Sequence, residues 1–171
     1  YSDEPLELRI GPYTTSVTPR GFLVLVDYAP FVAYTDPEYR LEMRRCRRHP
    51  RCDVSSDIDP GDIAILLAMT QAQQVNFPRR KSFKAFLIHP EEGGMSLVVL
   101  MADVTEHYLE GLRDLDRPFA ASLEVRRAVV SLKDGFEKLL EVIKWIVESA
   151  PKIRKASKAG KTKMKCFKRN L

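Results

Sequence analysis

Residues 124–149 read EVRRAVVSLKDGFEKLLEVIKWIVES, and the fold prediction depends mainly on this stretch. Its apolar residues recur at alternating spacings of four and three, which is the pattern of a helix that packs along a narrow seam. The seam residues are Val125, Val129, Leu132, Phe136, Leu139, Ile143 and Ile146. Leu140, Trp145 and Val147 widen this apolar surface, which indicates packing on two sides. We therefore predict one long apolar helix over residues 119–149, whose seam is an interface with another helix of this chain or of a partner.

The first 35 residues have the pattern of extended structure. Leu6, Leu8 and Ile10 alternate with charged residues, as in a half-buried strand, and Gly11 with Pro12 ends the run. The runs 22–28 and 31–34 are rich in β-branched and aromatic residues. These runs predict a small β-unit at the N-terminus.

Between these regions the chain carries several helix and strand signals. Asp36-Pro37 predicts a short basic helix that ends before Pro50, and Asp59-Pro60 predicts a largely buried helix that ends near Asn76. The apolar runs 83–88 and 96–101 fit a β-hairpin, although the second run also fits the start of a helix. Asp103 or Thr105 is placed to cap a helix over residues 105–115.

Together these signals predict an α+β fold, in which a small N-terminal β-rich unit precedes a predominantly helical domain with the long apolar helix. The expected domains are residues 1–78 for the β-rich unit with short helices, 79–150 for the helical domain with a hairpin at 83–101, and 151–171 for a basic C-terminal tail. The longest apolar run, residues 63–69, is far shorter than the roughly 20 residues that span a bilayer.

The charge of the chain is unevenly distributed. The net charge is +5, yet residues 150–171 hold nine positive residues and no acid, which leaves 19 positive and 23 negative residues in positions 1–149. Such a basic terminus is typical of an arm that binds nucleic acid or an acidic partner. We therefore predict nucleic-acid binding by Lys152, Arg154, Lys155, Lys158, Lys161, Lys163, Lys165, Lys168 and Arg169.

One short segment contains residue types that bind metals. Cys46, His49 and Cys52 are candidate zinc ligands, but a tetrahedral site needs a fourth, for which Cys166 or Asp53 would have to serve. The alternatives are a Cys46–Cys52 disulfide or free thiols. An odd number of cysteines, three in all, argues against a secreted disulfide framework, so we expect a cytoplasmic protein without a cofactor.

No combination of residues predicts catalysis. Asp103, His107 and Glu110 are spaced to share a helix face, but carboxylates are common near helix N-termini for electrostatic reasons. The three histidines do not assemble a nucleophile with its base, and we predict that the protein is not an enzyme. The basic stretches 40–51 and 79–84 either bind phosphates or pair with the acids of the body.

Three segments resemble, in the same order, a family of replication proteins. Residues 58–67 (IDPGDIAILL), leading to residues 75–78 (VNFP), resemble the end of the small β-domain of GINS proteins. Residues 108–115 (YLEGLRDL) are similar to the helix that opens their helical domain, and residues 124–139 (EVRRAVVSLKDGFEKL) resemble their central helix. The order corresponds to the GINS subunit type in which the β-domain comes first.

This resemblance implies a non-catalytic scaffold in DNA replication. Its partners would be another GINS subunit, the MCM helicase and a Cdc45/RecJ-like protein, in a hetero-oligomer that is associated with the nucleoid if the source is archaeal. The scarcity of Asn and Gln beside abundant Lys, Arg and Glu also predicts a thermophilic source. The alternative is a viral nucleoprotein or ribonucleoprotein component, whose tail neutralises phosphates of DNA or RNA.

Overall fold

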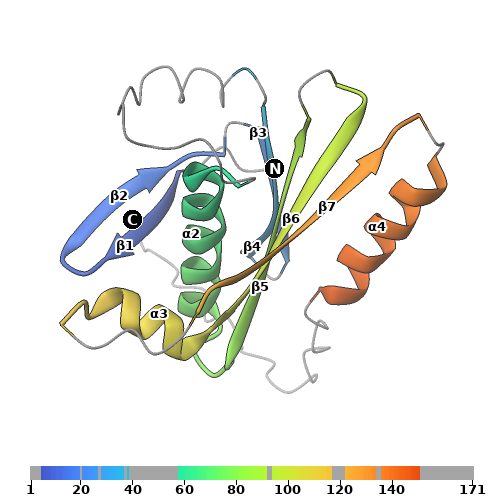
Figure 1. Ribbon diagram of the computed structural model, residues 1–171. Helices are drawn as coiled ribbons and strands as arrows, with labels where there is room; N and C mark the ends of the chain where they lie inside the picture. The colour runs from blue at the N-terminus through green and yellow to red at the C-terminus, as the bar shows by residue number, and fades with distance from the viewer. Residues whose placement is uncertain are drawn as a thin grey trace, which may run out of the picture.

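The computed structural model describes residues 5–19, 21–26, 28–36, 38, 58–91, 94–116, 122–133 and 136–150. Strands predominate in this part of the chain, and helices separate some of them (Figure 1). The strands are β1 (Leu6–Ile10), β2 (Tyr13–Val17), β3 (Gly21–Val26), β4 (Ala29–Thr35), β5 (Ser82–Pro90), β6 (Ser96–Thr105) and β7 (Glu124–Ser131). The helices are α2 (Pro60–Asn76), α3 (Glu106–Arg113) and α4 (Phe136–Ser149).

The centre of the molecule is a five-stranded sheet with the strand order β3-β4-β5-β6-β7. Neighbouring strands are antiparallel except β4 and β5, which run parallel. A parallel pair needs a crossover connection, and the chain from β4 to β5 contains α2. The remaining strands, β1 and β2, form a separate antiparallel hairpin.

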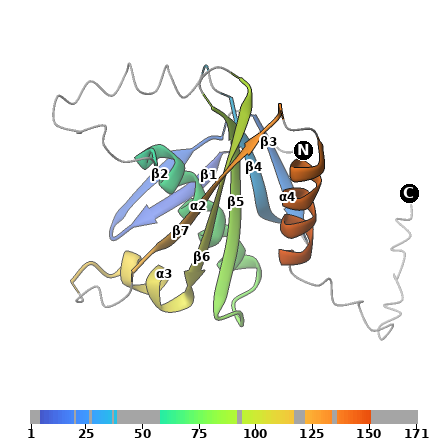
Figure 2. The ribbon, with the colours of Figure 1, turned by 45° about the vertical axis from the view of Figure 1, so that its right-hand side comes forward.

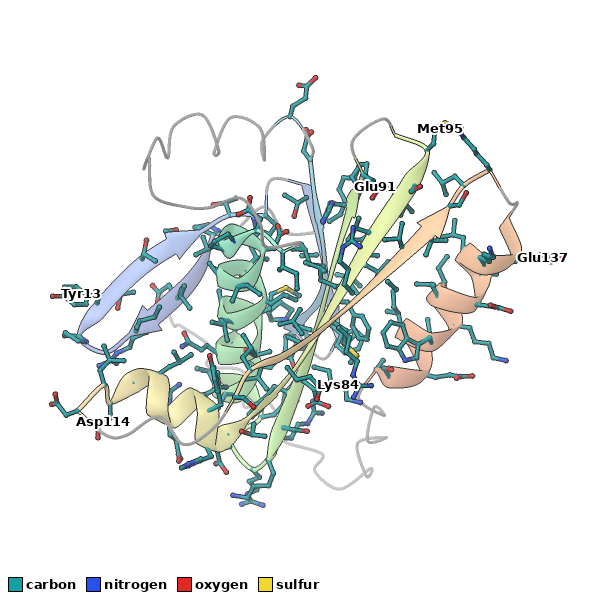
Figure 3. All side chains as sticks on the ribbon, in the orientation of Figure 1. Tyr13, Lys84, Glu91, Met95, Asp114 and Glu137 are labelled. Carbon is teal, nitrogen blue, oxygen red and sulfur yellow. The ribbon has the colours of Figure 1, made fainter. Side chains whose placement is uncertain are left out.

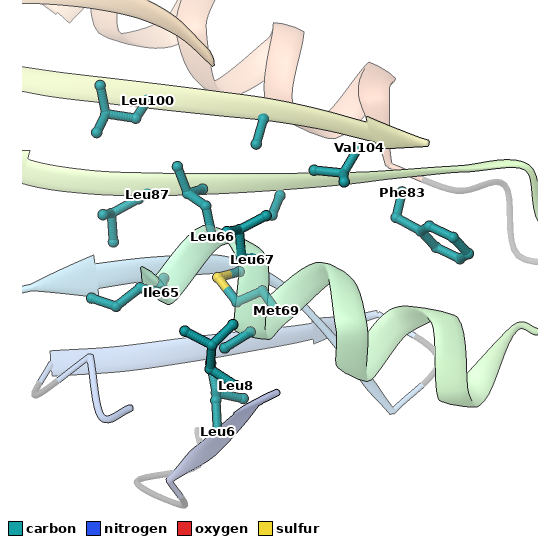
Figure 4. Close-up of a cluster of buried hydrophobic side chains, with 14 of the residues drawn as sticks. Leu6, Leu8, Ile65, Leu66, Leu67, Met69, Phe83, Leu87, Leu100 and Val104 are labelled. Atoms are coloured by element: carbon teal, nitrogen blue, oxygen red, sulfur yellow. The ribbon is translucent and has the colours of Figure 1, made fainter. Parts of the chain in front are cut away.

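Helix α2 begins where the sequence predicts. The Asp59 carboxylate accepts a hydrogen bond from the Gly61 N–H at 2.7 Å, and Pro60 occupies the first turn, where its missing N–H costs nothing. Most of the helix is buried, because it lies between the β1–β2 hairpin and one face of the sheet. Figure 4 shows Leu66, Leu67 and Met69 of α2 directed into this core. Strand residues of the same core are Leu6, Leu8, Phe83, Leu87, Leu100 and Val104.

Two glutamines of α2 pair with strand backbone on either side of the helix. The Gln71 side chain accepts from Arg9 N–H at 2.9 Å and donates to Arg9 C=O at 2.8 Å, so it holds the hairpin to the helix. Gln73 Nε2 donates to the carbonyl oxygens of Pro30 at 2.7 Å and Lys84 at 2.6 Å. It thereby links β4 to β5 near the start of their parallel pairing.

The hairpin is also fixed to α3, at a turn position whose backbone conformation favours glycine. Gly11 has φ +56°, and a Cβ there would lie 2.9 Å from Leu115 Cδ1. Its N–H donates to Leu112 C=O at 2.7 Å. The left-handed backbone at this turn is a conformation that residues with a side chain rarely adopt, whereas Leu115 Cδ1 is the end of a flexible, exposed side chain that can move aside.

The opposite face of the sheet carries α4, so the sheet lies between α2 and α4 (Figures 1 and 2). A second core forms there from Phe31, Phe86, Val99, Met101 and Val130 of the strands and Ile146 of α4. Strands β5 and β6 contribute alternate residues to the two cores, because successive side chains of a strand point to opposite faces.

The predicted fold class is wrong, because the molecule is a strand-rich α+β structure and not predominantly helical. The long apolar helix over residues 119–149 does not exist: residues 124–131 form β7, and α4 begins only at Phe136. Three of the eight β7 residues are valines, and β7 pairs with β6 from Glu124 to Ser131. Pairing with β6, together with this β-branched content, outweighs the helical spacing.

Several local predictions are confirmed. Strands form within residues 6–35, and α2 spans Pro60–Asn76. The runs 83–88 and 96–101 form the hairpin of β5 and β6. Thr105 caps α3 by accepting a hydrogen bond from the Tyr108 N–H. The predicted basic helix after Asp36 lies outside the described residues. The five-stranded sheet combines strands from both sides of residue 78, so the predicted units 1–78 and 79–150 share one sheet.

Candidate functional site

One side of α4 is anchored to the sheet by a defined aromatic contact. The Trp145 and Phe86 rings meet edge to face, with centroids 5.2 Å apart and an interplanar angle of 89°. Leu139, Val142 and Ile146 pack into the same core. These contacts fix the rotation of the helix about its axis, and with it the side that faces outward.

A second apolar side of α4 is exposed. Leu140, Ile143 and Val147 are 61%, 46% and 65% exposed, and their spacing of three and four residues places them on one side of the helix. We call these three residues the α4 apolar flank. Exposed apolar residues that cluster, and are not scattered singly, are typical of interaction sites.

The rest of the exposed surface of α4 is charged. Lys144 and Glu148 form an i,i+4 ion pair at 3.9 Å, and Glu137 lies at the outer edge of the helix (Figure 3). The helix ends at Ser149, directly before the nine positive residues of positions 150–171. Those positions beyond Ala150 lie outside the described residues.

The predicted seam is divided between two elements and does not form one surface. Val125 of β7 packs against the α2 side of the sheet, whereas Leu139 and Ile146 of α4 pack on the opposite side. Val129, Leu132 and Ile143 are exposed. Phe136 is the first residue of α4. The seam as predicted is therefore wrong, and the exposed apolar side of α4 is centred on Leu140, Ile143 and Val147.

The candidate acid–base and metal residues are not brought together. Asp103 lies in β6, whereas His107 and Glu110 lie in α3, so the three do not share a helix face. Asp103 is instead 3.7 Å from Lys84 Nζ across the β5–β6 pair. Within the described residues no group of three or more His, Cys, Asp or Glu side chains is placed to hold a metal ion. Cys46, His49, Cys52 and Cys166 lie outside them.

The basic stretch 79–84 is compensated in part by neighbouring carboxylates. Lys81 forms an ion pair and a hydrogen bond with Glu106. The hydrogen bond and the negative charge of Glu106 raise the pKa of Lys81 above its ordinary value. The Arg80 guanidinium lies 3.8 Å from the centroid of the Phe77 ring. Lys84 lies 3.7 Å from Asp103, so two of the four positive residues of this stretch lie beside a carboxylate. The other basic stretch, 40–51, lies outside the described residues.

A buried polar contact escaped the sequence analysis. Asp62, in the first turn of α2, and His89, near the end of β5, are 2% and 6% exposed, and Asp62 Oδ2 lies 3.8 Å from His89 Nε2. The two residues are far apart in sequence, and no spacing rule links them. The sequence offered one weak signal, the histidine that follows the apolar run 83–88. A histidine at that position usually faces solvent, so nothing in the sequence predicted that it would be buried.

None of the helices in the described part of the chain has both the length and the apolar character needed to cross a bilayer. No family model matches the chain, and neither a curated protein nor a solved structure matches it.

Proposed function

We propose that this protein is a non-enzymatic interaction subunit of a nucleic-acid-processing assembly. In this role the basic segment 150–171 binds phosphates, and the folded body contacts a helical protein partner through the α4 apolar flank. The observation that carries the proposal is the concentration of nine positive residues, without an acid, directly after an exposed apolar helix. Charges of one sign at this density have no local partners in the segment and attract a polyanion.

The chemistry of the basic segment favours sequence-tolerant binding. Seven of its nine positive residues are lysines, which act as point charges and do not read base edges in a bidentate manner. Phe167 is its one aromatic residue, so stacking on bases is a minor contribution. The expected ligand is therefore the phosphate backbone of DNA or RNA.

The α4 apolar flank suits a helix of another protein. Three apolar side chains at spacings of three and four form a ridge along α4, and such ridges pack into the grooves of a facing helix. The flank is rimmed by the Lys144–Glu148 pair, which leaves its centre free of charge. Charge depletion at the centre with a polar rim is typical of protein interfaces.

A replication scaffold of the GINS type is the most specific form of this proposal and stays a prediction. Of the three segments that carry the resemblance, residues 108–113 are helical in α3, whereas residues 124–131 form a strand and not the start of a central helix. A viral nucleoprotein or ribonucleoprotein component is the alternative, and the charge of segment 150–171 favours it equally.

Native mass measurement separates the two: a defined hetero-oligomer supports the scaffold, and a homopolymer on nucleic acid supports the nucleoprotein.

Removing the basic segment is expected to abolish salt-sensitive nucleic-acid binding. The full chain should bind duplex DNA with an affinity that falls with salt, by a slope of about −0.9 per phosphate contact on a log–log plot. A chain that ends at Ala150 should lose both the affinity and the slope. Fluorescence anisotropy with labelled duplex DNA and single-stranded RNA at several salt concentrations measures this.

The control for that experiment is a full-length chain in which Lys161, Lys163, Lys165 and Lys168 are changed to glutamine. This variant keeps the length of the segment and removes four charges, so its slope should fall by up to about 3.6 on duplex DNA. Unchanged binding by the shortened chain would reject the role of the segment.

Placing charge on the α4 apolar flank is expected to release the protein partner without unfolding the chain. In a Leu140→Lys/Val147→Lys variant both changes are at exposed positions, where substitutions usually change stability by less than about 0.5 kcal/mol each. The partner that co-purifies with the native chain should be lost, and the melting temperature should stay the same. The matched control is Glu141→Lys, an exposed residue on the same helix but outside the flank. Retention of the partner by the double variant would contradict this part of the proposal.

A further inference from the structure

The turn between α2 and β5 presents two arginines that no carboxylate pairs with in the described part of the chain. Arg79 is exposed and Arg80 is half-buried. Neither forms an ion pair with a described residue, whereas the two lysines of the same stretch lie beside carboxylates. The folded body therefore carries two arginine charges at this turn that its own acids do not pair.

The turn holds these side chains in a defined place. Residues 77–80 form a β-turn that is closed by a hydrogen bond from Arg80 N–H to Phe77 C=O at 3.0 Å, and Pro78 occupies its second position, where proline is favoured. The Arg80 guanidinium lies over the Phe77 ring, and it donates no hydrogen bond to a described residue. Stacking restricts the guanidinium but leaves the N–H donors at its edge available, so little conformational freedom is lost when they bind an anion.

The acids near the turn act on the lysines. Lys81 pairs with Glu106, and Glu110 also acts on Lys81 through its charge. Lys84 lies 3.7 Å from Asp103 across the β5–β6 pair. Each of these carboxylates thus faces a lysine, and a phosphate that approaches the turn meets the two unpaired arginines first.

The turn lies at the end of the sheet where α4 ends. Strand β5 starts directly after the turn, and its first residue, Ser82, pairs with Thr105 at the end of β6. Strand β7 runs away from this end, and α4 runs back towards it, so that Trp145 contacts Phe86 near the start of β5. In Figures 1 and 2 the α2–β5 connection lies at the bottom of the molecule, and α4 ends on that side. Ala150, the first residue of the basic segment, therefore lies at the same end as the turn.

We propose that the α2–β5 turn is a second phosphate-binding site, in which Arg79 and Arg80 contact backbone phosphates of the nucleic acid that the basic segment holds. This inference rests on the proposed function. A guanidinium matches a phosphate in a bidentate manner, which a lysine does not, so the turn positions the nucleic acid and the segment supplies most of the affinity. Because the segment keeps the nucleic acid close, the contact at the turn forms at a high effective concentration.

Salt-dependent binding by the full chain, followed by fluorescence anisotropy, tests the site. In an Arg79→Gln/Arg80→Gln variant two phosphate contacts are lost, so the log–log slope on duplex DNA should fall by up to about 1.8 and the affinity at 0.1 M salt by up to about 60-fold. On single-stranded RNA the slope should fall by up to about 1.4. The melting temperature should stay close to that of the wild type, because both residues lie in a surface turn. Two contacts are too few to hold nucleic acid alone, so a chain that ends at Ala150 is still expected not to bind.

The matched control removes two exposed positive charges away from the turn. In Arg113→Gln/Lys133→Gln one change lies at the end of α3 and the other after β7, at the opposite end of the sheet. This variant should keep the slope of the wild type. If the arginine variant loses no more slope or affinity than this control, the site at the turn is overturned and the proposed function stands. If the wild-type chain shows no salt-sensitive binding, both are overturned.

A measurement on the unaltered chain keeps the proposal testable if the arginine variant folds poorly. The side-chain Nε–H resonances of Arg79 and Arg80, followed by NMR on the full chain, should shift when duplex DNA is added. If residues 151–171 respond to saturating DNA and these two resonances do not, the site at the turn is overturned.

Discussion

Replacing Phe86 by alanine is expected to lower the free energy of unfolding by about 3–5 kcal/mol, the cost typical of removing a buried aromatic side chain. The Phe86 side chain is completely buried in the middle of the sheet. Its ring meets Phe31 at 5.3 Å and Trp145 at 5.2 Å, so it joins β4 and α4 through one residue of β5. Alanine would leave a cavity between the sheet and α4 that neither neighbour can fill without moving.

Trp145 is the single tryptophan of the chain, so its fluorescence reports on this contact directly. Urea unfolding followed by fluorescence gives the loss of stability, and the emission maximum of the folded variant gives the local effect. Phe83→Ala is the matched control, because Phe83 is as deeply buried but packs on the α2 side of the sheet. Both variants should lose comparable stability, and only Phe86→Ala should shift the native Trp145 emission towards that of an exposed indole. A loss below about 1 kcal/mol for Phe86→Ala would contradict the packing of α4 described above.

Replacing Gln73 by leucine is expected to cost about 1–3 kcal/mol for the buried acceptor that it leaves unpaired, and less for a second, partly buried one. Its amide nitrogen donates to Pro30 C=O on β4 and to Lys84 C=O on β5, at 2.7 and 2.6 Å. Leucine has nearly the same volume and no donor, so both carbonyl groups would lose this hydrogen bond, Pro30 C=O in a buried site and Lys84 C=O in a partly buried one. Urea unfolding measures the loss, and hydrogen exchange should show faster exchange of the β4 and β5 amides than elsewhere in the sheet.

The adjacent residue provides the control for that prediction. Gln74 is also buried, but its Oε1 has no hydrogen-bond partner among the described residues. Replacing it by leucine removes an unpaired polar atom, so the stability should stay close to that of the wild type or rise. Equal losses at both positions would show that the two hydrogen bonds of Gln73 contribute little and that the helix tolerates neither change.

The parts of the fold that depend on local chemistry could be predicted from the sequence. Asp59 and Pro60 mark the start of α2, and Gly11 with Pro12 marks the turn after β1, because caps and turns are set by the residues that form them. The region 124–131 could not be predicted in this way. Valine spacing that fits a helical seam also fits a strand whose two faces are both partly apolar, and only the pairing with β6 decides between them.

The candidate site was predictable to a similar degree. The charge of segment 150–171 is a property of composition, and Leu140 and Val147 were identified as apolar surface beyond the seam. Which side of α4 remains exposed depends on how Trp145 packs on Phe86, and this contact joins residues from distant parts of the chain. The Asp62–His89 contact was missed for the same reason, since the crossover geometry alone brings α2 and β5 together.

The parallel pairing of β4 with β5 also affects how the chain folds. Strands β5, β6 and β7 follow one another along the sheet, and β3 pairs with β4, so these contacts close shorter loops than the β4–β5 pairing does. The β4–β5 pairing must close the long stretch between Thr35 and Ser82, and its entropic cost is met only once α2 is in place. Assembly of the two strand groups around α2 is therefore the expected rate-limiting step. Interactions between β4 and β5, including the hydrogen bonds of Gln73, should affect the rate of folding more than interactions at either edge of the sheet.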